Sequence, residues 1–340
     1  MHIPDGYLSP ATCAALYAAS APFWYVAVRR LQRLLTNRLI PLLSVFAAFS
    51  FVIMMFNLPL PGGTTGHAVG VGIAAIVLGP WASILAISIA LLIQALFFGD
   101  GGITTLGANC FNIAVAGSLV AYASYRLLAG KAAITSRRRV VAAAVAGYFS
   151  INVAALLTAI EFGIQPLFFK DPSGAPLYAP YPLSVAIPAM MIGHLTIAGM
   201  AELVLTAGLV AWLARSHPSL LRATAPGASG EEDEAVAGWR VLRPLLIGLA
   251  ALMLITPVGI LAVGTAWGEW SPSDFPASVV PQGLGRLASV WTAPFPDYAP
   301  PFLRSPSFGY ILSALFGAGF ILLAALLADS FFAARRKRAP

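Results

Sequence analysis

Long apolar runs separated by short polar or basic segments dominate the chain. A helix needs about 20 mostly apolar residues to cross a bilayer, and runs of about that length recur along the sequence. The run at 67–79 is short and glycine-rich, and the run at 183–213 is long enough to tilt. We therefore expect an all-α integral membrane protein with about nine spans, at roughly 11–28, 39–57, 67–79, 81–98, 105–128, 139–162, 183–213, 243–265 and 308–328.

Composition supports this prediction. Of the 340 residues, 59% are hydrophobic and only 10% are charged, with a mean hydropathy of +0.83. Soluble domains carry about 25% charged residues, so this balance excludes a water-facing globule. The net charge of +7 does not indicate nucleic acid, because membrane topology also places basic residues. Cys13 and Cys110 stand in separate apolar runs and provide neither a disulfide framework nor a CxxC metal site.

The basic residues predict the orientation. With nine spans, all Lys and Arg except Lys170, Arg286 and Arg304 fall on one side of the membrane. By the positive-inside rule that side is cytoplasmic, so we expect the N-terminus outside and the C-terminus inside. An even number of spans would scatter the basic clusters over both sides.

A change in composition divides the chain into three parts. Residues 216–242 contain Pro, Gly and an acidic run at 231–234 and are predicted to be a cytoplasmic linker. Residues 1–215 precede it as a seven-helix unit. Residues 243–340 follow as two helices joined by an outside segment, 266–307, that is rich in Pro, Trp and Gly.

The first residues suggest a metal chelate. The start MHIPDGYLSP lacks the regions of a cleavable signal, and a bulky second residue favours retention of Met1 with a free amine. That amine, the backbone nitrogen of His2 and its imidazole can close fused rings around one ion, a square-planar nitrogen field that suits Ni(II) and Cu(II). His67, on the same predicted face, is a candidate fourth donor. Alternatively, His67 is an ordinary loop or core histidine.

Three motifs resemble one family. The start MHIPDGYLSP, GGTTGHAVG at 62–70 and QALFFGDGGITTLGANCFN at 94–112 are similar to the signatures of the CbiM/NikM family. These are the substrate-binding membrane subunits of energy-coupling-factor (ECF) transporters for nickel and cobalt, in the cytoplasmic membrane of bacteria or archaea. The resemblance implies that Met1, His2 and His67 bind Ni(II), or alternatively Co(II), as transported substrate without an organic cofactor. It also implies a transmembrane coupling subunit and ATP-binding-cassette ATPases as partners in the lipid membrane, and no nucleic acid.

The C-terminal part resembles a second component. Residues 281–284 and 295–298 are similar to the NikN-like accessory part that some nickel transporters carry fused to this subunit. The related motif has two acids where Gln282 and Gly285 stand here, which argues against direct metal ligation by that segment. A stabilising or metal-loading role, with the segment docked near the N-terminus, is compatible with the resemblance, as is an inert connector.

Further polar and small residues are candidates around the site. Amides and a carboxylate near helix ends could orient the ligands or attract cations, although helix–helix hydrogen bonds and an ordinary Asp-Gly turn explain them equally well. They are Gln94, Asp100, Asn109 and Asn112. Small residues four apart on the first span are candidates for contact with the coupling subunit, or for packing within the bundle. They are Ala11, Ala15 and Ala19.

Two other classes of function stay open. His194 and Glu202, inside one predicted span, could serve a membrane enzyme or a second cation site, although a buried structural role is favoured. A channel or sensor would use the same metal site without an ATPase. The chain has no Gly-x-x-x-x-Gly-Lys-[Ser/Thr] motif and no hydrolase signature, so we expect a non-enzyme whose ATP hydrolysis belongs to other subunits.

Overall fold

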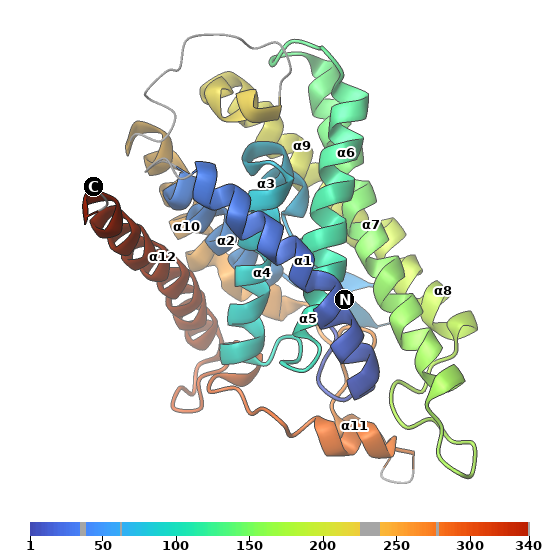
Figure 1. Cartoon of the computed structure of the whole chain (residues 1–340). Helices are drawn as coiled ribbons and strands as arrows, with labels where there is room; N and C mark the ends of the chain where they lie inside the picture. Colours follow the sequence, from blue (N-terminus) through green and yellow to red (C-terminus); the bar gives the residue numbers. More distant parts are fainter. Residues whose placement is uncertain (35–38, 62, 225–238, 277–278, 339–340) are drawn as a thin grey trace.

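Helices make up nearly all of the computed structural model, which describes residues 1–34, 39–61, 63–224, 239–276 and 279–338 (Figure 1). The α-helices are α1 (Pro10–Leu34), α2 (Leu39–Met54), α3 (Val71–Leu78), α4 (Pro80–Ile93), α5 (Leu106–Asn109), α6 (Gly117–Ala129), α7 (Arg137–Phe168), α8 (Leu183–Gly193), α9 (Gly199–Ser216), α10 (Trp239–Ile255), α11 (Gln282–Leu287) and α12 (Pro306–Arg338). The expected all-α class is confirmed.

The expected spans are helical, but two are shorter than predicted. Seven helical segments within the described residues are long and apolar enough to cross a membrane, as in a multi-pass membrane protein. The other two are α2, with 16 residues, and α3, with 8. Glycines with positive φ (+76°) lie at both ends of α3, at Gly70 and Gly79, and Pro80 starts the next helix. The predicted run 67–79 is therefore a loop followed by a buried helix.

Three of the long spans contain a π-helical segment. These segments are η1 (Gln94–Phe98) after α4, η2 (Cys110–Ala116) between α5 and α6, and η3 (His194–Ala198) between α8 and α9. Single π-turns inside α-helices occur frequently at functional sites. Each of these segments carries a polar residue singled out above: Gln94 in η1, Asn112 in η2 and His194 in η3.

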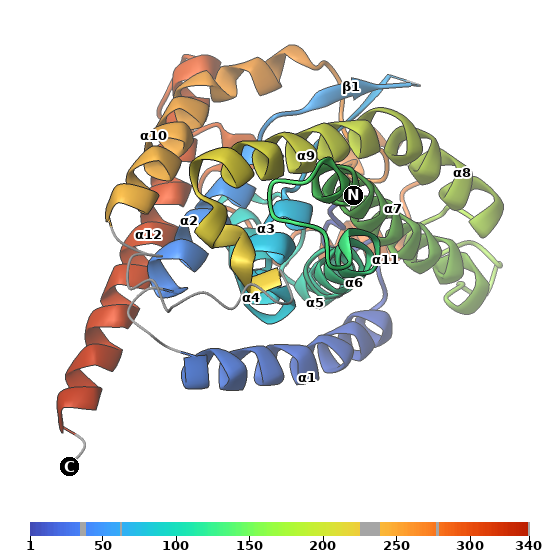
Figure 2. The ribbon, with the colours of Figure 1, turned by 90° about the horizontal axis from the view of Figure 1, so that it is seen from above.

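The short helix α3 occupies the centre. Its residues from Val71 to Val77 are all buried, as expected for a helix that is apolar on every side. It packs against α4, α6 and α7. Figure 2 shows α1 along one edge of the molecule and α12 along another, outside the central helices. Ala11 and Ala15 on α1 are exposed and Ala19 is half-buried.

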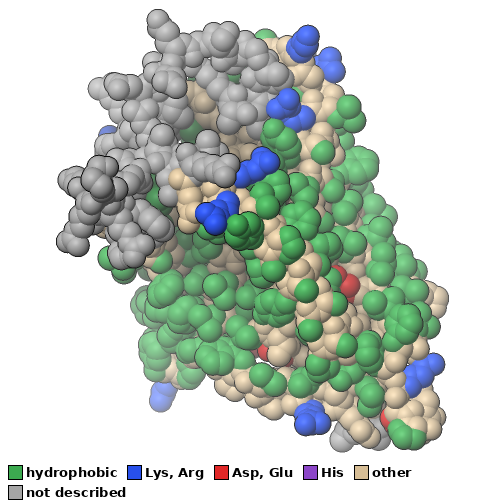
Figure 3. All heavy atoms as spheres, in the orientation of Figure 1, with side chains coloured by type: hydrophobic (Ala, Val, Ile, Leu, Met, Phe, Trp, Pro, Cys, Tyr) green, Lys and Arg blue, Asp and Glu red, His purple; other side chains and the backbone are tan. Residues whose placement is uncertain are grey.

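The surface has the character of a membrane protein. Hydrophobic side chains cover the middle of the face shown in Figure 3, while Lys and Arg gather toward its upper part and its lower rim. Large apolar side chains point outward, including Val204 (64% exposed) and Leu326 (59%). Such a band is unstable in water and stable in lipid. Of the predicted linker, residues 225–238 lie outside the described residues.

Two connections bring the N-terminus and the C-terminal part together. A small antiparallel hairpin of β1 (Leu58–Leu60) and β2 (Thr64–Gly66), absent from the sequence prediction, pairs Leu58 with Gly66 and Leu60 with Thr64. The segment 266–307 contains α11 and 3₁₀ turns at Pro272–Asp274 (η6) and Pro296–Tyr298 (η7). In Figure 1 it runs along the lower end, the end at which the first residues of the chain lie.

Candidate metal site

The first residues of the chain are buried. Met1, His2 and Ile3 are only 3%, 1% and 0% exposed. Hydrogen bonds to Ile3 hold this polar segment in place. Its N–H donates to Asn109 Oδ1 at 2.8 Å, and its carbonyl accepts from Asn109 Nδ2 at 3.1 Å and from the Gly102 N–H at 2.9 Å. The beginning of the chain is therefore anchored in the fold through the paired backbone groups of Ile3.

A glycine-rich loop closes over the segment. The Asp5 carboxylate accepts hydrogen bonds from the N–H groups of Ile103 (3.1 Å) and Thr104 (2.7 Å). Gly102 lies so close that a Cβ there would meet the Asp5 nitrogen at 2.4 Å. This close approach explains why glycine is required in the loop that follows η1.

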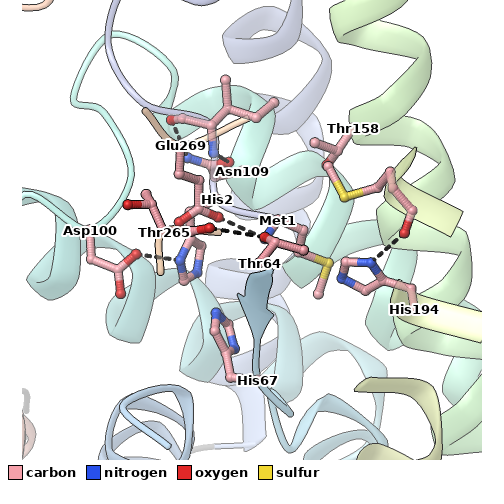
Figure 4. A network of polar contacts seen from close by, with 12 residues as sticks. Met1, His2, Thr64, His67, Asp100, Asn109, Thr158, His194, Thr265 and Glu269 are labelled. Carbon is pink, nitrogen blue, oxygen red and sulfur yellow. Dashed lines mark hydrogen bonds and ion pairs between the residues drawn. The ribbon is translucent and has the colours of Figure 1, made fainter. Parts of the chain in front are cut away.

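The two candidate imidazoles face each other. His67 follows β2 and lies outside the helices, and its ring stacks on His2 with centroids 5.0 Å apart (Figure 4). His67 Nδ1 pairs with the Ala68 carbonyl at 3.0 Å. A carbonyl only accepts, so Nδ1 carries the proton and Nε2 has the free lone pair. Burial, with the charges of His2 and the terminal amine, lowers the pKa of His67 to about 3 and keeps the ring neutral.

His2 has unsatisfied nitrogens. Its Nδ1 lies 2.5 Å from Asp100 Oδ1 without hydrogen-bond geometry, and its Nε2 has no partner among the described residues. Buried polar atoms are nearly always paired, so the lone Nε2 leaves the buried His2 ring incompletely satisfied. Burial raises the pKa of Asp100, but its contacts with His2 outweigh burial and hold that pKa below the usual range.

Two residues of the C-terminal part also reach the site. The Met1 amine pairs with Glu269 Oε1 at 2.8 Å, and the Tyr298 hydroxyl donates to Asp100 Oδ2 at 2.5 Å. Gln94 Nε2 donates to the same hydroxyl at 2.9 Å. Sequence reasoning missed Glu269 and Tyr298, because no motif marks a pairing between residues more than 190 positions apart.

A cavity adjoins these groups. Its volume is about 490 Å³, and it lies between the first unit and the C-terminal part. His67 and four carboxylates line it: Asp5, Asp100, Glu269 and Asp297. A cavity with this many carboxylates is electronegative and favours cations.

The other candidates divide between this site and the bundle interior. Gln94, Asp100 and Asn109 lie at the site, as described above. Asn112 instead donates to Glu161 at 2.8 Å and to Thr158 at 3.2 Å. His194 Nδ1 pairs with the Met190 carbonyl at 2.8 Å. Glu202 accepts three backbone N–H groups near His67.

The proposed donors differ from a side-chain cluster. Among the residues that the structure describes, no group of three or more His, Cys, Asp and Glu side chains is arranged to hold a metal ion. The set predicted from the sequence has two main-chain nitrogens, the Met1 amine and the His2 amide, and two imidazoles. Such a set is not visible as a side-chain cluster.

The fold is that of a multi-pass membrane protein, and it brings the Met1 amine and the His2 and His67 rings to one side of an acidic cavity. Residues 2–220 match the model of the CbiM family, described as the cobalt uptake substrate-specific transmembrane region, and the chain belongs to this family. The resemblance read from the three motifs is confirmed, and with it the family's role in metal transport.

Relatives and solved structures agree. The fused nickel transport protein NikMN of Rhodobacter capsulatus is 57% identical over 95% of each chain. The cobalt transport protein CbiM of Geobacter sulfurreducens is 34% identical over 81% of this chain and 75% of its own. A crystal structure of a truncated transition-metal transporter has a TM-score of 0.59 at 50% identity, covering 63% of this chain and 98% of that one.

Proposed function

We propose that this protein is the substrate-specific component of an ECF-type nickel uptake transporter and captures Ni(II) at the extracytoplasmic side. One observation carries the proposal: the terminal amine and the His2 and His67 rings lie together in one buried place, beside the carboxylates of Glu269 and Asp100. The Met1 amine, the deprotonated His2 amide and the His2 ring would form a tridentate chelate, and His67 Nε2 would complete a square-planar field.

Charge balance supports this ligand set. A divalent ion bound to one deprotonated amide and three neutral nitrogens leaves a net charge of +1 in a buried place. Such a charge is costly without nearby anions. Asp100 beside His2 and Glu269 beside the amine are placed to compensate it.

Nickel is favoured over cobalt as the substrate. Square-planar nitrogen fields suit Ni(II). The relatives that match over at least 93% of both chains include the fused nickel transport protein of Rhodobacter capsulatus and the probable fused nickel transport protein LarMN of Lactiplantibacillus plantarum. Co(II) is the second candidate, because the Geobacter relative is a cobalt transport protein.

We also propose a role for each of the three parts of the chain. Residues 1–215 form the metal-binding unit, 216–242 the cytoplasmic linker and 243–340 the accessory unit, whose segment 266–307 covers the site from outside. The N-terminus is extracytoplasmic and the C-terminus cytoplasmic, in agreement with the positive-inside rule. The exposed Ala11 and Ala15 give α1 a surface that lets a coupling-subunit helix approach closely. Partner ATPases supply the energy for inward release.

Uptake by cells tests the proposal. Radioactive nickel would be measured in cells that express this chain alone, with its coupling and ATPase subunits, and with an ATPase that cannot hydrolyse ATP. We expect uphill uptake only with the complete, active set. Equal uptake by the chain alone would indicate a channel and refute ATP-driven import.

A membrane enzyme based on His194 and Glu202 would behave differently. Such an activity would not use the N-terminal amine, so blocking the amine would leave it intact. The metal-capture proposal instead requires that blocking the amine abolish uptake.

A further inference from the structure

Glu202 is a buried carboxylate with an unusual set of partners. It lies on α9 and is 0% exposed. Its Oε2 accepts from the N–H groups of Val69 (2.8 Å) and Gly70 (2.9 Å), and its Oε1 accepts from the Gly72 N–H (3.1 Å). A buried carboxylate is expensive unless its lone pairs are used, so such an arrangement indicates a specific task.

Those three N–H groups belong to the segment that follows His67. They include free N–H groups at the start of α3, which have no partner within the helix and which favour a negative charge. The Val69 carbonyl is held as well, by the Ser50 hydroxyl at 2.6 Å. Only Ala68 stands between His67 and Val69, so a displacement of Val69 would move the imidazole of His67.

The helix that carries Glu202 is tightly packed against its neighbours at this level. A Cβ on Gly72 of α3 or on Gly147 of α7 would meet Thr206 Oγ1 at 2.6 Å. The backbones of α3, α7 and α9 therefore approach closely, and we expect a shift of α9 to displace α3 as well. The π-helical segment η3 directly precedes α9, and π-turns inside helices occur frequently at functional sites.

We infer that Glu202 is a positioning residue that ties the His67 segment to α9, so that the orientation of the candidate metal-binding imidazole follows the position of this helix. The inference rests on the proposed function, because the orientation of the His67 ring affects metal affinity only if His67 binds the metal. It also offers a physical route by which movement of α9 weakens one of the four metal bonds and promotes release.

Two glutamate-to-glutamine variants provide a matched comparison. Glu202→Gln keeps the shape but replaces one acceptor oxygen by an NH₂ group, which repels a backbone N–H. Glu161→Gln is the control, because Glu161 is also a buried glutamate in the bundle but accepts from Asn112 instead of the His67 segment. Glu202→Asp, which keeps the charge but shortens the reach, serves as a second variant if Glu202→Gln does not fold.

The measurement is Ni(II) affinity of the purified full chain together with the visible absorption band of square-planar Ni(II), in the wild-type and His67→Ala backgrounds. We expect Glu202→Gln to weaken affinity about 10-fold or more and to shift the band, and Glu161→Gln to do neither. In the His67→Ala background, Glu202→Gln should change affinity less than about 2-fold, since the effect passes through His67.

Two results would overturn the inference. One is unchanged affinity and absorption in both Glu202 variants; the other is an equal loss with and without His67, which would indicate a general structural role. If His67→Ala alone leaves affinity and the band unchanged, the proposed ligand set fails and the inference fails with it. A loss with His67→Ala but none with the Glu202 variants refutes the inference alone.

Discussion

Replacing Glu269 by Gln tests whether the C-terminal part holds the beginning of the chain. The substitution keeps the size of the side chain but removes the negative charge that lies 2.8 Å from the Met1 amine. The side chains of Met1 and Glu269 are 1% and 18% exposed, so water compensates only in part for the lost pair. A hydrogen bond to a charged group contributes about 1.5–3 kcal/mol net, so we take about 2 kcal/mol for this pair.

The loss of this interaction free energy predicts how much more often the N-terminal segment leaves its buried position. Because each 1.4 kcal/mol is a factor of ten, about 2 kcal/mol raises the open fraction about 30-fold. An amine-specific acylating reagent reacts only with the open form, so the acylation rate of Met1 should rise by about that factor. Lys131 and Lys170, both exposed, provide internal reference rates in the same molecule.

Mass spectrometry of the acylated peptides would measure these rates in metal-free protein. Asp297→Asn is the matched control, since Asp297 lines the same cavity and the amine pairs with Glu269 instead. We expect no more than a small change in that control. If Met1 in Glu269→Gln reacts at the wild-type rate relative to both lysines, the ion pair does not hold the terminus and the reasoning is wrong.

Two further substitutions test the surroundings of the site. Gly102→Ala places a Cβ 2.4 Å from the Asp5 nitrogen, and we expect about 1–3 kcal/mol of destabilisation and weaker nickel binding. Gly208→Ala, where no atom lies within 4 Å, is the control, and equal melting temperatures would contradict the prediction. Tyr298→Phe removes the hydroxyl that donates to Asp100, and we expect about 1 kcal/mol, or about 5-fold, weaker binding by calorimetry. Unchanged affinity would show that this hydrogen bond does not support the site.

Apolar run length was a reliable guide to the helices. It gave the positions of the long spans, because burial in lipid requires an uninterrupted apolar helix. It overestimated α3, since hydropathy does not distinguish a helix buried in protein from one that spans lipid. Gly70 and Gly79, with φ of +76°, limit that helix to 8 residues. The π-helical segments also carry no hydropathy signal.

The sequence predicted those parts of the candidate site whose residues are neighbours along the chain. The Met1 amine and the two proposed nitrogen donors of His2 are adjacent in sequence, so the first two residues alone suggest the chelate. The contacts of Glu269 and Tyr298 depend on how segment 266–307 folds back over the site, and nothing in one sequence specifies that packing. Glu202 looked like half of a possible pair with His194, whereas its partners are backbone N–H groups beside His67.

The role of the terminal amine is tested most directly by measuring nickel binding to purified protein with a blocked and with a native N-terminus. The protein is made as a fusion with several residues before Met1, and a protease then removes them so that Met1 comes first. Nickel binding before and after cleavage is compared in one preparation. A single added residue is unsuitable, because it creates a third-position histidine that chelates nickel itself. His67→Ala, with the native start, tests the fourth donor.

We expect one tightly bound Ni(II) ion per chain after cleavage, and none above background in the uncleaved fusion. His67→Ala should bind nickel more weakly and lose the absorption band of the square-planar complex. Equal stoichiometry and affinity before and after cleavage, in protein that is equally well folded, would contradict the account.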